Sequence, residues 1–321
     1  VNSCWDVNIA LVSGRHHCIK SYESVFPGFP VLPLENRTGS PEGRRQAIAL
    51  LLRERSPDLV IGVNVADLYL AASLARLKGF KGRVVMSLHA IAADLLEDAK
   101  AYSFLIDAVI ATNYLTCRIL KDVSGFPEDR VMYAPYGVKS DNSLLNLTSS
   151  QSTNDPLLIA WVGRLEQDQK RIWDLLPILT HLDSLGLSYH LTIAGDGPEM
   201  HRLSDSLRHW TSRGLVTLLG ALSPLQLQSD VYANHHVLLI TSNWETGPIV
   251  AWEAMSAGLV VVSSSYIGSG LENALRHDEN CLLFPIGDTV RAAHAIFGLR
   301  DSARRVMLSR RGQSLVKERY S

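Results

Sequence analysis

Two features of the sequence predict an α/β protein made of two doubly wound domains. Short runs rich in β-branched residues alternate with segments of helical periodicity along the whole chain, which is typical of parallel sheets wrapped by helices. The alternation stops once, at the polar run SDNSLLNLTSSQSTND (140–155), which indicates a linker. We therefore predict a first domain over residues 1–142, a linker over 143–155 and a second domain over 156–321, whose last helix could cross back.

The first domain contains five predicted strands with helical segments, such as 42–55 and 66–78, between most of them. The strands are 7–13, 58–63, 83–88, 107–112 and 130–134. No Gly-rich turn follows the first strand, and the chain starts almost directly in that strand and stops in a helical run. We therefore expect a fragment whose first domain is incomplete at its start.

The second domain repeats the alternation, with strands predicted at 157–162, 189–194, 215–219, 236–241 and 259–263. Between the second and third of these, Met200, Leu203, Leu207 and Trp210 follow one another at steps of three and four, which predicts one amphipathic helix. Two such domains form a cleft, and ligands of these sheets bind at the carboxyl ends of the strands.

Composition and charge exclude several classes of protein. The 321 residues are 46% apolar and 20% charged, with a formal net charge of −1, which excludes disorder and makes nucleic acid an unexpected partner. No apolar run approaches the roughly 18 to 20 residues that span a bilayer. The four cysteines are scattered, so neither disulfides nor structural zinc are expected, and we expect a cytoplasmic location.

The first candidate site follows the strand 157–162. Gly163 lets the backbone approach a ligand, Arg164 offers a planar pair of donors to phosphate, and Lys170 adds a mobile charge. Together they could hold a diphosphate. Two solvated cations at a strand end are the alternative. The turn Gly195-Asp-Gly-Pro198, after the next strand, is a weaker motif that could simply connect strand to helix.

The most informative motif is a pair of glutamates eight residues apart, Glu245 and Glu253. Residues 249–257 are nearly all apolar or small, so the helix they form should be buried, and an unpaired Glu253 there would be costly. A ribose diol is a suitable partner. Glu245 precedes the helix, whose first N–H groups, near Ile249 and Val250, favour an anion. Two surface carboxylates are the alternative.

These motifs together resemble the donor half of retaining glycosyltransferases of family 4, which have the GT-B fold. The resemblance covers residues 157–299 and rests on Gly163-Arg164 with Lys170, Gly195-Asp-Gly-Pro198, Gly220 with Leu222, and Glu245 with Glu253 followed by Ala254-Met-Ser-Ala-Gly258. The chain departs from the family pattern at Arg171 and Tyr136, where the family often has Gly and Asn.

The resemblance implies a role for each matching position. Arg164 and Lys170 would hold the nucleotide diphosphate, so no metal and no cofactor would be required. Glu253 would bind the ribose, and the backbone near Leu222 would contact the base. The site of the sugar and distal phosphate would comprise Glu245, the turn Thr246, Gly247 and Pro248, and the amides of Ile249 and Val250. His89, after strand 83–88, falls where such enzymes place a histidine facing the sugar, although a histidine after a strand is otherwise most often structural.

The function implied is transfer of a hexose, most simply from a UDP-sugar, to a saccharide or lipid-linked acceptor in polysaccharide or glycolipid synthesis. A nucleotide-sugar epimerase on the same fold and an inactive nucleotide- or carbohydrate-binding scaffold are the alternatives. The cluster Arg304, Arg305, Arg310 and Arg311 could face anionic lipid at the inner side of a membrane, and a solvated helix face is the other interpretation.

Overall fold

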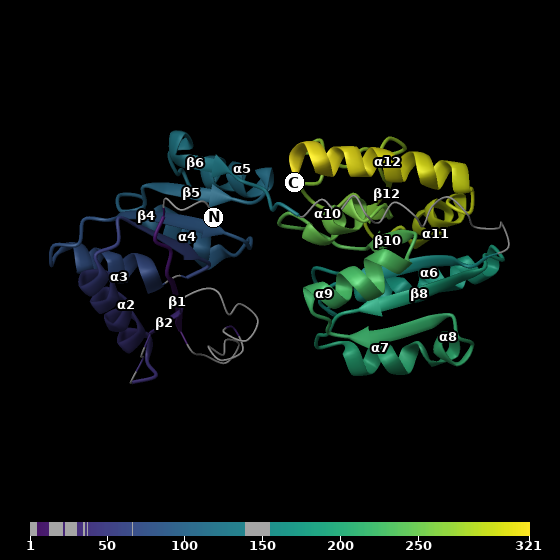
Figure 1. Cartoon of the computed structure of the whole chain (residues 1–321), viewed down its shortest axis with the longest axis horizontal. Helices are drawn as coiled ribbons and strands as arrows, with labels where there is room; N and C mark the ends of the chain where they lie inside the picture. The colour runs from purple at the N-terminus through teal and green to yellow at the C-terminus, as the bar shows by residue number, and fades with distance from the viewer. Residues whose placement is uncertain are drawn as a thin grey trace. The chain divides into compact units, whose positions relative to one another are not determined.

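A computed structural model describes residues 5–12, 22, 31–34, 36, 38–65, 67–138 and 155–321 (Figure 1). The chain divides into two compact units. The first comprises Val1–Thr112 and Thr116–Ala134, and the second comprises Asn113–Leu115 and Pro135–Ser321. The predicted linker, 143–155, lies outside the described residues except for Asp155, so its boundaries remain a prediction.

The first unit contains a parallel sheet of four strands in the order β3-β4-β5-β6 and a separate parallel pair, β1 and β2. Helix α2 begins where Ser40 Oγ accepts from the N–H of Gly43 and Pro41 takes the first position, both typical of a helix start. The elements of this unit are β1 (Ile9–Val12), β2 (Val31–Leu34), α2 (Pro41–Arg55), β3 (Leu59–Val63), α3 (Asp67–Arg76), β4 (Arg83–Leu88), α4 (Ala93–Ala101), β5 (Ala108–Ala111), most of α5 (Tyr114–Asp122) and β6 (Val131–Tyr133).

The second unit is built on a parallel sheet of six strands in the order β12-β11-β10-β7-β8-β9. Numbered within the unit, this is the order 6-5-4-1-2-3 of a doubly wound, Rossmann-type sheet. Its elements are β7 (Leu157–Val162), α6 (Leu175–Ser184), β8 (Tyr189–Ala194), α7 (Met200–Ser206), α8 (Arg208–Ser212), β9 (Val216–Gly220), α9 (Pro224–Gln226), β10 (Val237–Ile240), α10 (Ile249–Ser256), β11 (Val260–Ser264), β12 (Leu282–Phe284), α11 (Thr289–Gly298) and α12 (Ser302–Arg319).

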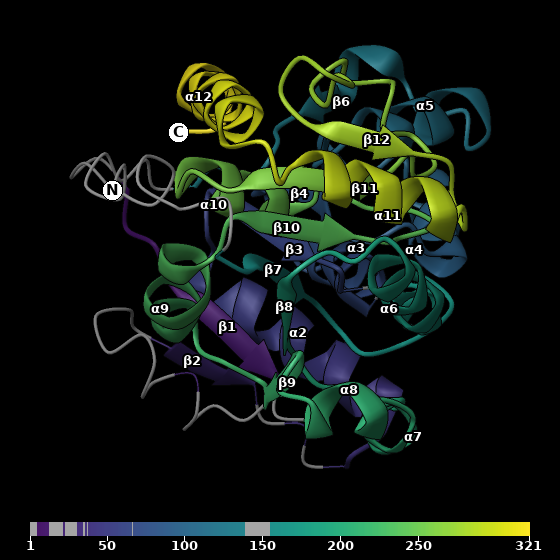
Figure 2. The same ribbon diagram turned by 90° about the vertical axis from the view of Figure 1, so that its right-hand side faces the viewer.

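Side chains of this sheet alternate between two apolar cores, one on each face. On β7, Ile159 and Trp161 join the core under α6 and α11, whereas Ala160 joins the core under α10 and α12. Figure 2 shows α6 and α11 on one side of the strands and α10 on the other. A strand buried on both faces reads as a nearly continuous apolar run. β7 (LLIAWV) is such a run, and its predicted bounds are correct.

The segment 200–210 forms two helices, so the prediction of one amphipathic helix is wrong. Helix α7 ends at Ser206, and α8 begins at Arg208. Leu203 and Leu207 are both fully buried in the core under α6 and α11. The periodicity therefore identified the buried face correctly, but local spacing did not register the break at Leu207.

His236 is a buried histidine in the second unit. His236 is 2% exposed, and its Nδ1 accepts a hydrogen bond from the N–H of Leu158 at 3.0 Å, which requires the neutral ring. Burial, with the nearby positive charge of Arg305, lowers the pKa of His236 to about 4. In the unfolded chain a histidine has a pKa of about 6.5.

We expect the free energy of unfolding to be highest above pH 6.5 and to fall by about 3 kcal/mol between pH 6.5 and 4 through His236. Below about pH 6.5 the unfolded chain binds a proton at His236, whereas the folded protein, in which the pKa of His236 is about 4, does not bind it. In His236→Asn, the side-chain oxygen still accepts from Leu158 but does not titrate, so this loss should shrink. Urea unfolding between pH 4 and 7 measures this pH dependence, with His201→Asn, at an exposed histidine, as the control. If His236→Asn and the wild type show the same pH dependence, His236 is not its source.

Candidate functional site

The second sheet reverses its winding between two neighbouring strands. β7 is followed by β8 on one side of the pair, whereas β10 is followed by β11 on the other. Ligands of open parallel sheets bind outside the carboxyl ends of the strands at such a switch point. The segments that leave these ends, 163–171 and 241–248, carry most of the predicted site residues.

Hydrogen bonds join these two segments directly. The Thr241 hydroxyl donates to the carbonyl of Lys170 at 2.6 Å. The N–H of Asn243 donates to the carbonyl of Gln169 at 2.7 Å, and the Gln169 side-chain amide donates to the carbonyl of Trp244 at 3.1 Å. The segments therefore form one connected structure, although they lie more than 70 residues apart in the chain.

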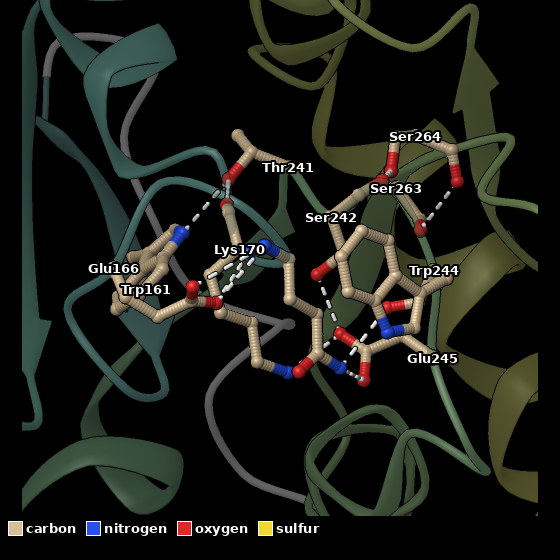
Figure 3. Close-up of polar contacts among 10 residues, drawn as sticks. Trp161, Glu166, Lys170, Thr241, Ser242, Trp244, Glu245, Ser263 and Ser264 are labelled. Atoms are coloured by element: carbon tan, nitrogen blue, oxygen red, sulfur yellow. Dashed lines mark hydrogen bonds and ion pairs between the residues drawn. The ribbon is translucent and has the colours of Figure 1, made fainter. Parts of the chain in front are cut away.

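The carboxylate of Glu245 lies at the centre of this structure (Figure 3). Its side chain is 6% exposed, and Oε1 accepts from Lys170 Nζ at 2.6 Å and from the Ser242 hydroxyl. Oε2 accepts from the Gln169 side-chain amide at 3.5 Å. A buried carboxylate needs a charged partner and hydrogen bonds to offset its loss of water. An ammonium has three donors, and among the described residues only Glu245 accepts from that of Lys170.

Arg164 is the second cation at this edge. It is exposed, and within the described ranges its guanidinium has neither a hydrogen bond nor an ion pair. The N–H of Gly163 donates to the carbonyl of Ala194 at 3.0 Å, which holds the start of the segment against β8. The predicted pair of cations is therefore present, with Lys170 bound to a carboxylate and Arg164 available.

The Gly195–Pro198 turn supports the segment that carries Arg164. A side chain at Gly195, whose φ is +144°, would place Cβ 1.8 Å from the carbonyl oxygen of Gly163, and one at Gly197 would lie 2.3 Å from that of Leu165. The N–H of Leu165 also donates to the carbonyl of Asp196. Asp196 Oδ1 accepts from the N–H of Gly197, so it caps the turn. These contacts favour a structural role for this motif.

Glu253 lies on α10, which is buried as predicted, but its carboxylate has a partner from the chain. The Tyr232 hydroxyl donates to Oε2 at 3.0 Å. Burial raises the pKa of Glu253, and the tyrosine hydrogen bond opposes that shift. The chain itself therefore supplies one partner for this carboxylate, which sequence analysis did not find because Tyr232 lies 21 residues away and no local pattern reveals it. A ribose diol as a further partner stays a prediction.

The turn before α10 supplies fewer free donors than predicted. Gly247 has a φ of +97°, which favours glycine, and its carbonyl accepts the N–H of Ile249 at 2.8 Å. The N–H of Val250 has no partner among the described residues. Of the two predicted amides, that of Val250 alone is available without rearrangement of the turn. Thr246 is half-buried, and Pro248 is buried directly before the helix.

Two predicted residues belong to other elements than these two segments. Leu222 is half-buried against the core under α10, next to Ser223, which caps α9. His89 follows β4 in the first unit, where its Nε2 contacts the Ser87 hydroxyl at 3.0 Å and its N–H donates to Asn64 Oδ1 at 3.0 Å. Burial lowers the pKa of His89, which favours the neutral ring.

Two general features of the described ranges bear on function. None of their helices combines the length with the apolar character that a membrane crossing requires. Nor does this part of the chain hold three or more His, Cys, Asp or Glu side chains arranged to bind a metal ion.

The family described as Glycosyl transferases group 1 matches residues 156–301, the range that contains Arg164, Lys170, Glu245 and Glu253. Residues 156–301 belong to the group 1 glycosyltransferases.

The similarity to individual members of this family extends beyond residues 156–301. Lipopolysaccharide 1,6-galactosyltransferase of Salmonella typhimurium is 26% identical over 238 residues, which cover 74% of this chain and 64% of that protein. The Escherichia coli protein of the same name is 23% identical over 252 residues, or 75% of this chain and 65% of that protein. The chain thus spans slightly less than two thirds of the length of these relatives.

Solved structures show that the likeness covers almost the whole chain. HepE of Anabaena, in complex with UDP and glucose, matches with a TM-score of 0.77 at 16% identity, over 97% of this chain and 88% of that one. The apo form of the lipopolysaccharide outer core galactosyltransferase WaaB matches with a TM-score of 0.65 at 22% identity, over 93% of this chain and 82% of that one. The predicted GT-B fold, with two Rossmann-like domains, is confirmed.

The Gly195–Pro198 turn packs closely against the backbone of Gly163 and Leu165, which predicts the effect of a side chain at Gly197. Gly197→Ala should lower the free energy of unfolding by about 2 kcal/mol or more, since its Cβ would meet backbone atoms that cannot move alone. Gly270→Ala is the matched control, because no atom lies within 4 Å of its Cβ position. Urea unfolding measures both; equal stability of the two variants would contradict the packing role of Gly197.

Proposed function

We propose that the chain is a retaining glycosyltransferase that moves a hexose from a UDP-sugar to a saccharide or lipid-linked acceptor, without a metal ion, in polysaccharide or glycolipid synthesis. One observation carries the proposal: Arg164 and Lys170 both follow the end of β7 at the switch point. Among the residues that the structure describes, Arg164 has no partner and Lys170 donates only to Glu245. The names of the relatives, lipopolysaccharide galactosyltransferases, and the UDP and glucose held by HepE support the donor and acceptor classes.

In the proposed reaction, the positive charges of Arg164 and Lys170 lie where negative charge develops on the diphosphate. When the bond between the anomeric carbon and the diphosphate oxygen breaks, its electron pair stays on the diphosphate, and the Arg164 and Lys170 charges offset it. The acceptor hydroxyl forms the new bond on the same face of the sugar, and its proton passes to the departing diphosphate. Glu245 holds the Lys170 ammonium in place, and Glu253 has a second carboxylate oxygen for the ribose.

We expect a single nucleoside diphosphate, UDP, to stabilise the chain with and without EDTA. A ligand at 100 times its dissociation constant adds about 2.7 kcal/mol to the free energy of unfolding. Thermal melts with UDP, GDP, ADP and CMP measure this. No stabilisation by any of them, or stabilisation that EDTA abolishes, would contradict the proposed donor site.

Arg164→Ala and Lys170→Ala should each lower turnover on the order of 10²-fold, as loss of an oxyanion-stabilising group does. Donor consumption with acceptor measures the rate, and the anomeric configuration of the product tests retention. Arg208→Ala is the control, because Arg208 is exposed on α8 and, in the part of the chain that the structure describes, pairs only with neighbouring Asp205. Unchanged turnover in Arg164→Ala, or conversion of the donor to its epimer without acceptor, would overturn the proposal.

A further inference from the structure

We propose that Thr241 and Trp161 are positioning residues for Lys170, which fix the peptide that carries its ammonium. The proposal rests on the proposed function and deepens it. Thr241 directly follows β10 and is 1% exposed, and Trp161 lies on β7 and is 2% exposed. Neither residue belongs to the cations or carboxylates that the sequence motifs single out.

The hydrogen bonds from Trp161 to Thr241 and from Thr241 to Lys170 can run in one direction only. Trp161 Nε1 lies 3.2 Å from Thr241 Oγ1, and Thr241 Oγ1 lies 2.6 Å from the carbonyl oxygen of Lys170 (Figure 3). An indole N–H can only donate, so Thr241 must accept from it. The hydroxyl has one proton, which is then directed at the Lys170 carbonyl. Trp161 thereby orients the Thr241 hydroxyl so that its proton points to the Lys170 carbonyl.

Packing brings Trp161 and Lys170 together a second time. A Cβ at Gly163 would lie 3.3 Å from the Trp161 ring and 3.6 Å from Lys170 Cε. The indole ring and the aliphatic stem of Lys170 therefore approach the same point at the end of β7. Glu245 holds the ammonium, and Thr241 with Trp161 holds the backbone, so the side chain is fixed at both of its ends.

The consequence for catalysis is geometric. Displacement of a catalytic group by about 1 Å can cost on the order of 10²-fold in rate, and without the Thr241 hydroxyl the Lys170 peptide loses its link to β10. We expect Thr241→Val to lower kcat about tenfold, equivalent to one hydrogen bond. The KM for the donor should change far less, because charge on the diphosphate rises in the transition state.

The test compares wild type, Thr241→Val, Thr241→Ser and Thr192→Val in donor turnover and thermal stability. Thr241→Ser keeps the hydroxyl and should recover most of kcat. Thr192 is the matched control: it is a buried threonine of the same sheet, whose hydroxyl contacts His235 at 2.7 Å. Thr192→Val should lose stability but keep its kcat.

A double variant tests the order of the contacts. If Trp161 acts through Thr241, Trp161→Phe lowers kcat in the wild type and adds nothing in Thr241→Val. Wild-type kcat in Thr241→Val, or no recovery in Thr241→Ser, would overturn the positioning role.

Lys170→Ala separates this failure from failure of the proposed function. An inactive wild type, or a fully active Lys170→Ala, overturns the proposed function and the positioning role with it. An active wild type with impaired Lys170→Ala and fully active Thr241→Val overturns the positioning role alone.

Discussion

The ion pair between Lys170 and Glu245 is the interaction on which the rest of the site depends. A carboxylate that is 6% exposed is tolerated because an ammonium at 2.6 Å and two neutral donors replace its water. Removal of one partner of such a pair typically costs about 3–5 kcal/mol, because a buried charge is left uncompensated. The two segments that supply the pair are therefore held in one arrangement before any ligand binds.

That arrangement is a consequence of strand order. β7 and β10 are neighbours only because the sheet winds in both directions from them, and their carboxyl ends bring residues 163–171 and 241–248 together. Support comes from both sides: the turn at Gly195 packs behind Arg164, and Ser264 on β11 donates to the carbonyl of Ser242 at 2.6 Å. The cations are thus presented from a rigid edge, as electrostatic stabilisation requires.

Much of the fold could be predicted from local patterns, since the buried parallel strands are short runs rich in apolar and β-branched residues. β4, β7 and β8 have their predicted bounds, whereas β2 and β12 were missed. In β2, Pro33 interrupts the apolar run, and a proline within a run argues against a strand. In the candidate site, residue type and spacing singled out Arg164, Lys170 and Glu245, which lie in the segments that follow β7 and β10, and their roles stay predictions. Tyr232 beside Glu253 and Trp161 beside Thr241 lie 21 and 80 residues from their partners, and only the folded sheet brings them together.

The most direct test of this account is the affinity of Arg164→Ala for a nucleoside diphosphate and for the matching monophosphate, measured by calorimetry against wild type. Arg164 is exposed and has no partner among the described residues, so its loss should leave the fold intact. The account predicts that the diphosphate binds about 10- to 100-fold more weakly, as loss of a charged hydrogen bond implies, whereas the monophosphate binds almost as before. Unchanged affinity for the diphosphate, or an equal loss for both nucleotides, would contradict it.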